Sequence, residues 1–226
     1  MNRIGAIIAA AGSGARFGGP KQFAFLGGRP LLDWSCEAFE AHPLIDDIVL
    51  VLPAQAETAG WAERFPKIID VVYGGRRRQD SVRAGFNRFD PGRTGLVLVH
   101  DGARPLVSAD VIDRVIEAAR KNGAAIPIIA SEDSLKEIES DRIVRTLDRN
   151  RVGRVQTPQG FSYILLDRAL TSADEAEYTG TDEASLVERL GEPVTVVAGD
   201  PRNVKITTPL DLIAAKAIQN ENRPGL

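Results

Sequence analysis

The feature that most constrains the fold is a repeated alternation of short apolar segments with longer amphipathic ones between residues 4 and 129. The apolar segments predict strands at Ile4–Ala9, Asp47–Pro53, Ile68–Val72, Leu96–His100 and 124–129. Helical periodicity is found between them at Pro30–Ala41, Ala54–Arg64, Asp80–Phe89 and from Ser108, as N-cap, to Gly123. Strands that alternate with helices favour a parallel sheet with right-handed crossovers. The sequence therefore predicts an α/β fold, a Rossmann-like, mostly parallel twisted sheet flanked by helices.

The alternation stops after residue 130. The segment Ser134–Asn150, "SLKEIESDRIVRTLDRN", alternates polar and apolar residues around "SD", which predicts a protruding β-hairpin arm at about 133–155. A lone hairpin is only marginally stable in water, so an arm of this kind favours a partner. The rest of the chain returns to the α/β pattern. Val155–Gln159 leads into a helix from about Ser162, and a second helix follows with Thr181 as its N-cap. The last predicted elements are a strand "PVTVVAG", a closing helix "TTPLDLIAAKAIQN" and a frayed tail at 221–226.

We expect a single domain over 1–226.

Charge and cysteine usage limit the partners and the compartment. The formal net charge is −3, so no whole-surface attraction to nucleic acid or to an anionic membrane is expected, and anions must be bound by a local cluster. Cys36 is the single cysteine, which excludes an internal disulfide and fits a reducing compartment. No apolar segment approaches membrane length, and the apolar start runs directly into a glycine-rich loop. We expect a cytoplasmic protein without nucleic-acid or membrane partners.

The glycine-rich loop after the first predicted strand, "AAAGSGARFGGPKQF", does not match the two common phosphate-binding motifs. A Walker loop needs lysine directly after its last glycine and Ser or Thr next, whereas here Pro20 precedes Lys21 and Gln22 follows it. A dinucleotide fingerprint needs glycine three positions after Gly14, where this chain has Phe17.

A looser phosphate-binding role remains open for the same loop. Backbone N–H groups at Gly12, Ser13 and Gly14 would line an anion site, and Arg16 and Lys21 would supply positive charge. A glycine-rich surface turn with two solvated cations is the alternative. The loop alone does not decide between these interpretations.

Two further residues lie in positions where ligands bind in such folds. Asp101, in "HDGARP", follows the strand at Leu96–His100, and open α/β sheets bind ligands at the carboxyl ends of their strands. A carboxylate there suits Mg²⁺, although it also suits the simple capping of the next turn. Lys205 falls in a strand-like piece within "GDPRNVKITTPLDL" and, taken alone, is typical of a solvated surface lysine.

A set of motifs spread over nearly the whole chain resembles one enzyme family. The motifs "AAAGSGARFGGPKQF", "GGRRRQDSV", "HDGARP", "DSLK", "LDRN", "QTPQGF", "TDEAS" and "NVKIT" occur in order and are similar to those of 2-C-methyl-D-erythritol 4-phosphate cytidylyltransferases. The first motif is shared by many nucleotidyltransferases, whereas its combination with "HDGARP", the arm and "TDEAS" is specific. The resemblance implies cytidylyl transfer from CTP to methylerythritol phosphate, with release of pyrophosphate, in the non-mevalonate isoprenoid pathway.

Two alternatives accompany this interpretation. A cytidylyltransferase that uses ribitol 5-phosphate shares most of the motifs, although "TDEAS" and the arm favour methylerythritol phosphate. A non-catalytic nucleotide-binding module predicts a disrupted set of cations, whereas Arg16, Lys21 and Lys205 are all present.

The resemblance also implies roles for the residues on the nucleotide side. Arg16, Lys21 and Lys205 would be catalytic, because cations are needed where charge builds up around the α-phosphate. Similar proteins often carry an acid just after the glycine pair, where this chain has Arg76, and we interpret Arg76 and Arg77 as solvated and Arg78 as structural. The implied CTP-binding residues are Ala10, Ala11, Gly12, Ser13, Gly14, Gly75, Ser81 and Asp101.

On the acceptor side, the resemblance implies a homodimer whose arms reach across to the neighbouring site. A phosphate oxygen with a second pKa of about 6 is already ionised and needs no general base, so His42 and His100 are interpreted as structural. A divalent cation, Mg²⁺ or another, would bind at Asp101. The implied substrate-binding residues are Asp101, Arg104, Thr157, Thr181 and, from the arm, Ser134 and Arg149, with serine at 134 where similar proteins usually have threonine.

Overall fold

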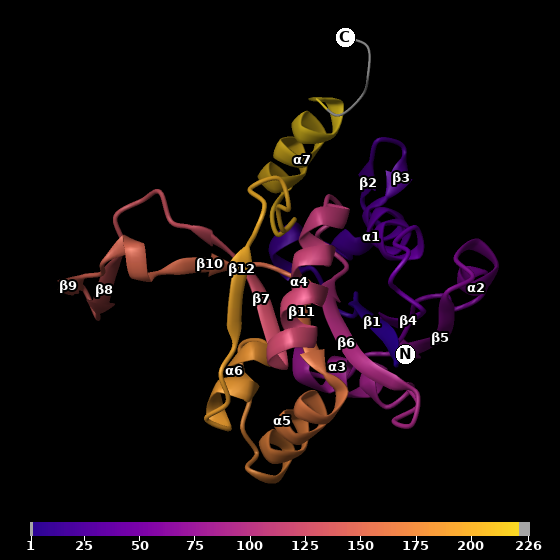
Figure 1. The fold of residues 1–226 in the computed structure, drawn as a ribbon. Coiled ribbons are helices and arrows are strands. Elements are labelled where there is room, and N and C mark those ends of the chain that lie inside the picture. The colour runs from indigo at the N-terminus through magenta and orange to yellow at the C-terminus, as the bar shows by residue number, and fades with distance from the viewer. Residues whose placement is uncertain (1, 222–226) are drawn as a thin grey trace.

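A computed structural model describes residues 2–221 and shows one central sheet of eight strands (Figure 1). The strand order is β10-β7-β11-β6-β1-β4-β5, where β10 and β11 pair with successive parts of one edge of β7 and β12 pairs with the opposite edge. The bounds of its strands are β1 Arg3–Ala9, β4 Asp47–Leu52, β5 Ile68–Tyr73, β6 Thr94–Asp101, β7 Ala124–Ala130, β10 Gly153–Val155, β11 Gln159–Ser162 and β12 Thr195–Ala198.

The sheet is mostly parallel, which confirms the predicted fold class. β1 runs parallel to β4 and β6, β4 to β5, and β7 to β12. β11 lies antiparallel between β6 and β7, and β10 pairs antiparallel with β7 beyond it. These two reversed strands correct the sequence prediction, which treated Val155–Gln159 only as a lead-in to a helix.

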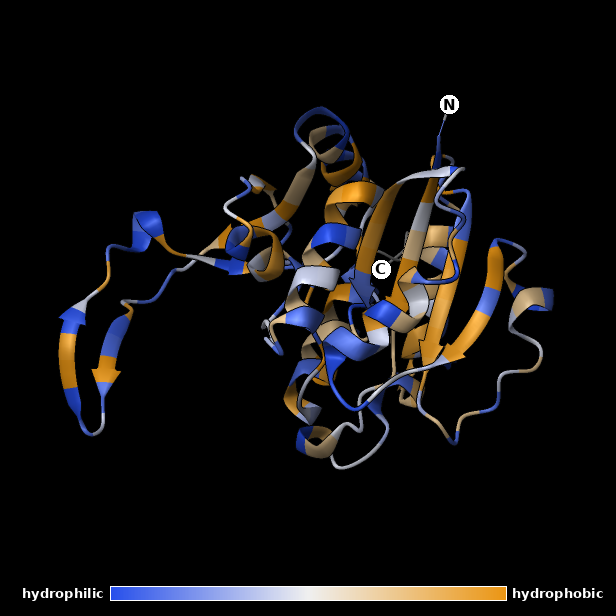
Figure 2. Ribbon diagram, turned by 90° about the horizontal axis from the view of Figure 1, so that it is seen from below, coloured by the Kyte–Doolittle hydropathy of each residue, from blue (hydrophilic) through white to orange (hydrophobic). Residues whose placement is uncertain are grey.

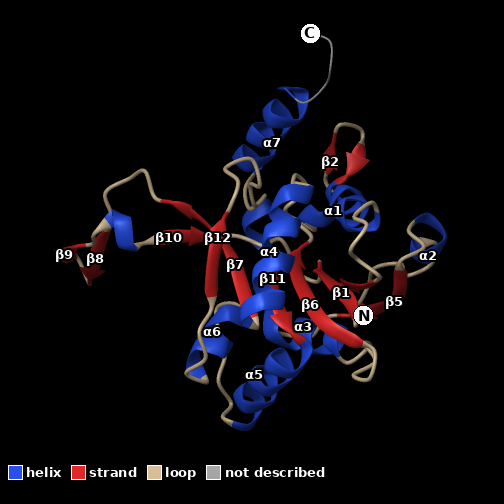
Figure 3. Ribbon diagram, viewed as in Figure 1, coloured by secondary structure: helices blue, strands red, loops and turns tan. Residues whose placement is uncertain are grey.

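Helices cover both faces of the sheet (Figure 3). Apolar side chains of α1, α2 and α4 pack on one face, and those of α3, α5 and α6 pack on the other. The strands between them read as nearly continuous apolar runs because both faces are buried, as β4 is at every position. The helices are α1 Leu31–Glu40, α2 Trp61–Arg64, α3 Arg78–Phe86, α4 Ala109–Asn122, α5 Tyr163–Glu175, α6 Glu183–Arg189 and α7 Pro209–Glu221.

Two helix predictions need correction. The helix predicted at Ala54–Arg64 is reduced to the single turn of α2 at its end, and Gly60 precedes that turn in a left-handed conformation. Asp182 rather than Thr181 is the N-cap of α6, because the Asp182 carboxylate accepts a hydrogen bond from the Ser185 N–H at 3.0 Å.

The predicted hairpin is present and extends away from the body of the molecule (Figure 1). Its strands, β8 Lys136–Glu139 and β9 Arg142–Thr146, pair only with each other among the described residues. Apolar segments alternate with polar ones along it (Figure 2), and Ile138 and Ile143 are 66% and 64% exposed. The hairpin therefore presents apolar surface that a single chain leaves uncovered.

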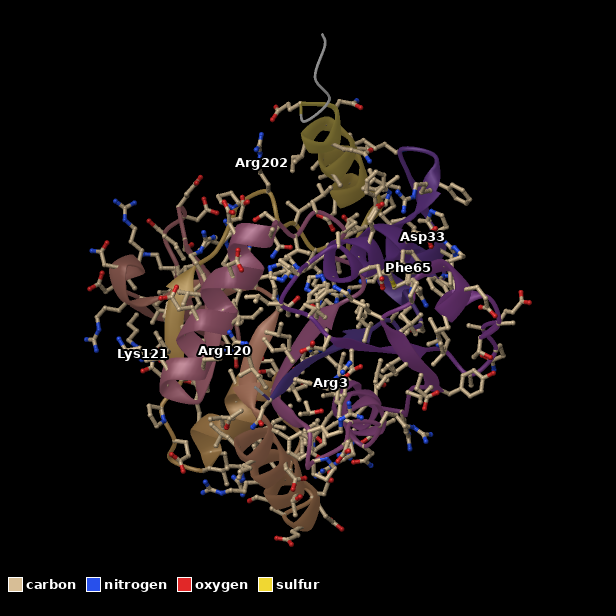
Figure 4. All side chains as sticks on the ribbon, turned by 45° about the vertical axis from the view of Figure 1, so that its right-hand side comes forward. Arg3, Asp33, Phe65, Arg120, Lys121 and Arg202 are labelled. Atoms are coloured by element: carbon tan, nitrogen blue, oxygen red, sulfur yellow. The ribbon has the colours of Figure 1, made fainter. Side chains whose placement is uncertain are left out.

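The remaining elements fix the ends of the chain against the body. Arg3, labelled in Figure 4, binds both carboxylate oxygens of Asp47 at 2.6 Å and ties β1 to β4. The small hairpin of β2 Phe25–Leu26 and β3 Arg29–Pro30 shares a satellite apolar cluster with α7, through Leu26 and Ala215. None of the helices within residues 2–221 has the length and apolar character needed to cross a bilayer. Residues 222–226, most of the predicted frayed tail, lie outside the described residues.

Candidate active site

A cavity of about 420 Å³ lies at the carboxyl ends of the central parallel strands. It is formed by the loop after β1, the loop after β5, the first turns of α3, the end of β6 and the segment before α7. The lining residues are Ala9, Ala10, Ala11, Gly12, Ser13, Lys21, Gln22, Gly75, Arg76, Arg77, Arg78, Ser81, Asp101, Ala103 and Lys205. The position is the one at which open α/β sheets bind ligands.

The loop after β1 folds back on itself at Gly14. Gly14 has a φ of +70°, and its carbonyl oxygen accepts hydrogen bonds from the N–H groups of Phe17 and Gly18 at 2.8 and 3.1 Å. A Cβ at this position would lie 1.8 Å from the Gly19 carbonyl oxygen, so glycine is required. The loop thereby returns Lys21 to the cavity, where a 3₁₀ turn at Lys21–Phe23 begins.

The loop after β5 approaches the loop after β1 closely enough to require a second glycine. A Cβ on Gly74 would lie 2.2 Å from the Ala11 Cβ and 2.6 Å from the Ser81 Oγ. Gln22, almost fully buried, donates a hydrogen bond to the Gly12 carbonyl at 3.2 Å and supports the opposite side of the same wall. This part of the cavity is therefore built from small residues and main-chain atoms.

Asp101, the last residue of β6, has a cation at each carboxylate oxygen. The Arg78 Nε donates to Oδ1 at 3.3 Å, and the Lys205 Nζ lies 2.7 Å from Oδ2. Burial alone would raise the pKa of Asp101, but the charges of Arg78, Lys205 and Arg104 outweigh it and hold that pKa well below its usual range. Asp101 is therefore an ionised, oriented acceptor at the floor of the cavity.

Three buried residues support Asp101 from behind. The Asp101 N–H donates to the Thr157 Oγ1 at 3.1 Å, and the same oxygen lies 3.1 Å from the His100 Nδ1. Arg104 donates to the Asn203 carbonyl at 2.7 Å and also approaches Oδ2 of Asp101, at 3.6 Å. Arg104 and Thr157, predicted to bind substrate, thus lie behind Asp101 rather than in the cavity wall of the described chain, and His100 is structural as predicted.

Positive charge also gathers around Lys21. Burial, together with the charges of Lys205 and Arg16, lowers the pKa of Lys21, while Asp101 partly compensates. Arg16 is exposed on the 3₁₀ turn Ala15–Phe17 and lies outside the cavity lining, although it is close enough to act on Lys21. Two of the three predicted catalytic cations, Lys21 and Lys205, therefore share the cavity with Asp101, and Arg16 lies beside it.

The other predicted residues divide into two groups. Ala10, Ala11, Gly12, Ser13, Gly75 and Ser81 line the cavity, and Gly14 shapes its loop. Thr181 is exposed just before α6, while Ser134 and Arg149 lie on the arm, away from the cavity of the same described chain. Arg149 borders a different cavity of about 790 Å³ at the root of the arm. Lys205 lies in the irregular segment between β12 and α7 rather than in a strand.

Sequence reasoning missed several residues at the cavity. Gln22 was used only to exclude a Walker loop. Arg76 and Arg77 are exposed, but both line the cavity, and Arg77 is paired with Asp80 at 2.6 Å rather than simply solvated as predicted. Glu183 was not singled out, although it is fully buried and accepts hydrogen bonds from Arg78 at 2.6 and 2.7 Å. Their signal was present in the motifs "PKQF", "GGRRRQDSV" and "TDEAS", but a spacing pattern does not reveal which side chains pair.

The oxygen ligands at the cavity bear on whether a magnesium ion can bind there. No three His, Cys, Asp or Glu side chains within residues 2–221 group into a protein-only metal site. Asp101 is a single ionised carboxylate at the cavity floor, and Mg²⁺ typically binds proteins through one or two carboxylates and takes its other ligands from phosphates and water. A cation that arrives with a phosphorylated ligand would share Asp101 with Arg78 and Lys205, which already contact its two oxygens.

Comparison with known proteins gives one consistent result. The model of a family described as 2-C-methyl-D-erythritol 4-phosphate cytidylyltransferase matches residues 4–221. The chain is 43% identical over 223 residues to the protein of that name from Syntrophus aciditrophicus, covering 95% of each chain. It is 40% identical over 228 residues to the corresponding Geobacter metallireducens protein, covering 97% of this chain and 98% of the other.

Solved structures agree with this result. The crystal structure of a 4-diphosphocytidyl-2C-methyl-D-erythritol synthase from Anaerococcus prevotii matches with a TM-score of 0.87 and 35% identity, covering 97% of this chain and 99% of the other. The crystal structure of the Thermus thermophilus 2-C-methyl-D-erythritol 4-phosphate cytidylyltransferase matches with a TM-score of 0.82 and 36% identity, covering 96% and 99%.

Proposed function

Because this chain belongs to the 2-C-methyl-D-erythritol 4-phosphate cytidylyltransferase family, we propose that its cavity binds CTP and transfers the cytidylyl group to 2-C-methyl-D-erythritol 4-phosphate. The protein is a nucleotidyltransferase of isoprenoid precursor biosynthesis. The observation that carries the assignment of the cavity is the convergence of Lys21, Lys205 and Asp101 beside a wall of small residues.

In this reaction a phosphate oxygen of the acceptor attacks the α-phosphorus of CTP. A new P–O bond forms there, the bond to the β-phosphate breaks, and pyrophosphate leaves with the electron pair. The attacking oxygen is already ionised near neutral pH, so no residue has to remove a proton from it. The barrier is the approach of two anions, together with the charge that develops around the α-phosphorus.

Lys21 and Lys205 are the residues that lower this barrier, with Arg16 beside them. Cations that are held in position before the reaction stabilise the developing charge without reorganising, and removing one such donor typically costs about 10²–10³ in rate. Burial of Lys21 strengthens its interaction with a phosphate, because the surroundings screen the charge less than water does.

The cytosine ring is assigned to the wall formed by Ala10, Ala11, Gly12, Gly75 and Ser81. Small residues let main-chain donors and acceptors reach the edge of a base, and the close contact of Gly74 with Ala11 brings the two loops together. Ser13 and Gly14 belong to the turn that would carry the phosphates.

Asp101 is assigned to the ribose or acceptor hydroxyls and to a divalent cation. When Mg²⁺ is bound it neutralises phosphate charge. Asp101 itself is ionised and presented to the cavity by Arg78, Thr157 and the segment that carries Lys205. Arg104, Thr157 and Thr181 are assigned to the acceptor side.

The arm is proposed to form a homodimer and to complete the neighbouring active site. Its exposed Ile138 and Ile143 need a covering surface, and Ser134 and Arg149 lie on the arm rather than at the cavity of their own chain. A hydroxyl and a guanidinium supplied in this way suit the phosphate of the acceptor.

Turnover tests the proposed function directly. Pyrophosphate release is measured with CTP and methylerythritol 4-phosphate, and then with ribitol 5-phosphate in its place. We expect release with methylerythritol 4-phosphate at a kcat/KM well above that for ribitol 5-phosphate. A higher kcat/KM for ribitol 5-phosphate, or no release with either acceptor, would contradict the proposal.

A further inference from the structure

Glu183 is a fully buried carboxylate that contacts Arg78, a residue of the cavity lining, without lining the cavity itself. It is 1% exposed, it is the first residue of α6, and both of its oxygens accept hydrogen bonds from the Arg78 Nη1, at 2.6 and 2.7 Å. A buried carboxylate costs free energy to desolvate, so its presence calls for a reason beyond the stability of the fold.

Arg78 connects this carboxylate to the floor of the cavity. Its Nη1 binds Glu183, while its Nε donates to the Asp101 Oδ1 at 3.3 Å. The guanidinium is rigid and planar, so its nitrogens point in fixed directions. When Glu183 holds Nη1, the direction in which Nε points toward Asp101 is therefore defined as well. The chain of contacts joins α6, α3 and the end of β6, elements that are remote from one another in the sequence.

The charges of Glu183, Arg78 and Asp101 alternate along this chain of contacts. Although burial opposes it, the carboxylates of Glu183 and Asp101 raise the pKa of Arg78, so that Arg78 stays charged. Because Arg78 is paired with Glu183 at 2.6 and 2.7 Å and with Asp101 at 3.3 Å, its charge already has partners inside the protein and competes less with Lys21 and Lys205 for phosphate. Lys205 binds the second oxygen of Asp101, so the carboxylate is fixed from both sides.

We propose that Glu183 is a positioning residue of the active site, which acts by holding Arg78 against Asp101. The inference rests on the proposed function and adds to it a residue that touches neither substrate. Its role is to fix the orientation of Asp101 and to keep the Arg78 charge away from the triphosphate.

Glu183→Gln tests the proposal, because glutamine keeps the size and one acceptor but removes the charge. We expect kcat/KM to fall by about 10-fold, mainly in kcat, as is typical when a residue that orients a ligand-binding group is changed. The matched control is Asp33→Asn. Asp33, labelled in Figure 4, is another buried carboxylate paired with an arginine, Arg64, but it lies on α1 outside the cavity lining. We expect it to change thermal stability without lowering kcat/KM.

A double-mutant cycle separates positioning from a general effect on the fold. If Glu183 acts through Arg78, Glu183→Gln has no further effect on kcat/KM in an Arg78→Met background. Arg78→Lys, which keeps the charge but loses the fork, is expected to fall between wild type and Arg78→Met, and it serves if Arg78→Met does not fold. Additive effects, or wild-type kcat/KM in folded Glu183→Gln protein, would overturn the inference.

A crystal structure of the Glu183→Gln protein tests the geometry without any turnover. We expect the Arg78 guanidinium to leave Asp101 Oδ1, and an unchanged contact would overturn the inference. Failure of wild-type protein to release pyrophosphate would instead count against the proposed function, so the two failures are distinguishable.

Discussion

The Lys205 ammonium lies 2.7 Å from the Asp101 Oδ2, although Lys205 precedes α7 near the end of the chain and Asp101 ends β6 in its middle. The contact fixes one wall of the cavity against its floor. It also explains why Asp101 remains ionised in a buried position, because Lys205 is one of the cations that hold its pKa down. The effect of removing Lys205 is therefore expected at the reacting phosphate as well as at Asp101.

Lys205→Met is expected to lower kcat by about 10²–10³, because one prepositioned cation is lost where charge develops. Lys216→Met, on an exposed position of α7, is the matched control and should leave kcat unchanged. The measurement is pyrophosphate release at saturating CTP and acceptor. A Lys205→Met protein with wild-type kcat would remove this lysine from the mechanism.

Lys21→Ala is expected to abolish turnover while CTP affinity stays within about one order of magnitude, because the main-chain wall still contacts the nucleotide. Calorimetric titration with CTP and the pyrophosphate assay measure the two effects separately. Unchanged turnover would show that Lys21 takes no part in the reaction. Loss of CTP binding in proportion to turnover would assign it to binding alone.

Two inactive variants are expected to restore activity when their chains are mixed. If the arm of one chain completes the site of the other, Lys21→Ala and Arg149→Ala form heterodimers that contain one intact site each. Unfolding and refolding an equal mixture should then recover about a quarter of the wild-type activity, since half of the dimers are mixed. The control is a mixture of Lys21→Ala with Lys205→Met. Both substitutions lie in the cavity of their own chain, so every site in the mixed dimers is damaged and no activity should be recovered.

A result of no recovery from the first mixture would contradict the shared site. Light scattering on the wild-type protein provides an independent check, because a fully active monomer at working concentration would exclude the dimer.

Stability is expected to decrease as the pH falls from about 6.5 to 4. Burial lowers the pKa of His100 to about 4, so the unfolded chain takes up a proton over this window while the folded chain does not. The corresponding loss is about 3 kcal/mol. Urea unfolding across the window should show a shallower pH dependence for His100→Gln, and the same dependence as wild type would contradict this role.

His42 has to be tested beside it, because burial also lowers the pKa of His42 despite the nearby Asp113. His42→Gln serves as the comparison, and the two substitutions should each remove part of the pH dependence. The lowered pKa of Asp101 adds stability that is lost progressively below about pH 5, mostly beneath this window.

Gly74→Ala is expected to weaken CTP binding. The added Cβ would lie 2.2 Å from the Ala11 Cβ, so the loops after β1 and β5 would have to separate and the wall assigned to cytosine would lose its shape. Gly92→Ala, whose Cβ comes no closer than 3.3 Å to the Asp90 Oδ1, is the control. Equal CTP affinities for the two variants would contradict the role of Gly74.

Most of the fold followed from the pattern of apolar residues, but the reversed strands did not. β4 and β6 were predictable because burial on both faces produces unbroken apolar runs. β10 and β11 are short and polar in part, and their pairing with β7 depends on contacts that no local pattern records. The cap of α6 was misassigned by one residue because Thr181 and Asp182 are both good N-cap residues, and only geometry distinguishes them.

The position of the cavity was predictable where a motif follows a strand, as for Asp101 at the end of β6 and for the glycine-rich loop after β1 that carries Lys21. The site was not predictable where a side chain acts through another one. Neither Gln22 nor Glu183 has a distinctive spacing, and their roles emerge only from the contacts of Gln22 with the Gly12 carbonyl and of Glu183 with Arg78. Electrostatic pairing between distant segments is a property of the folded chain rather than of any window of sequence.

The wall from Ala9 to Ser13 has a consequence for inhibition. A compound that fills this part of the cavity would contact mainly main-chain groups, which substitutions other than proline leave in place. Escape from such a drug would have to come through changes that reshape the loop, and the crowding at Gly14 and Gly74 leaves little room for them without harming the enzyme itself.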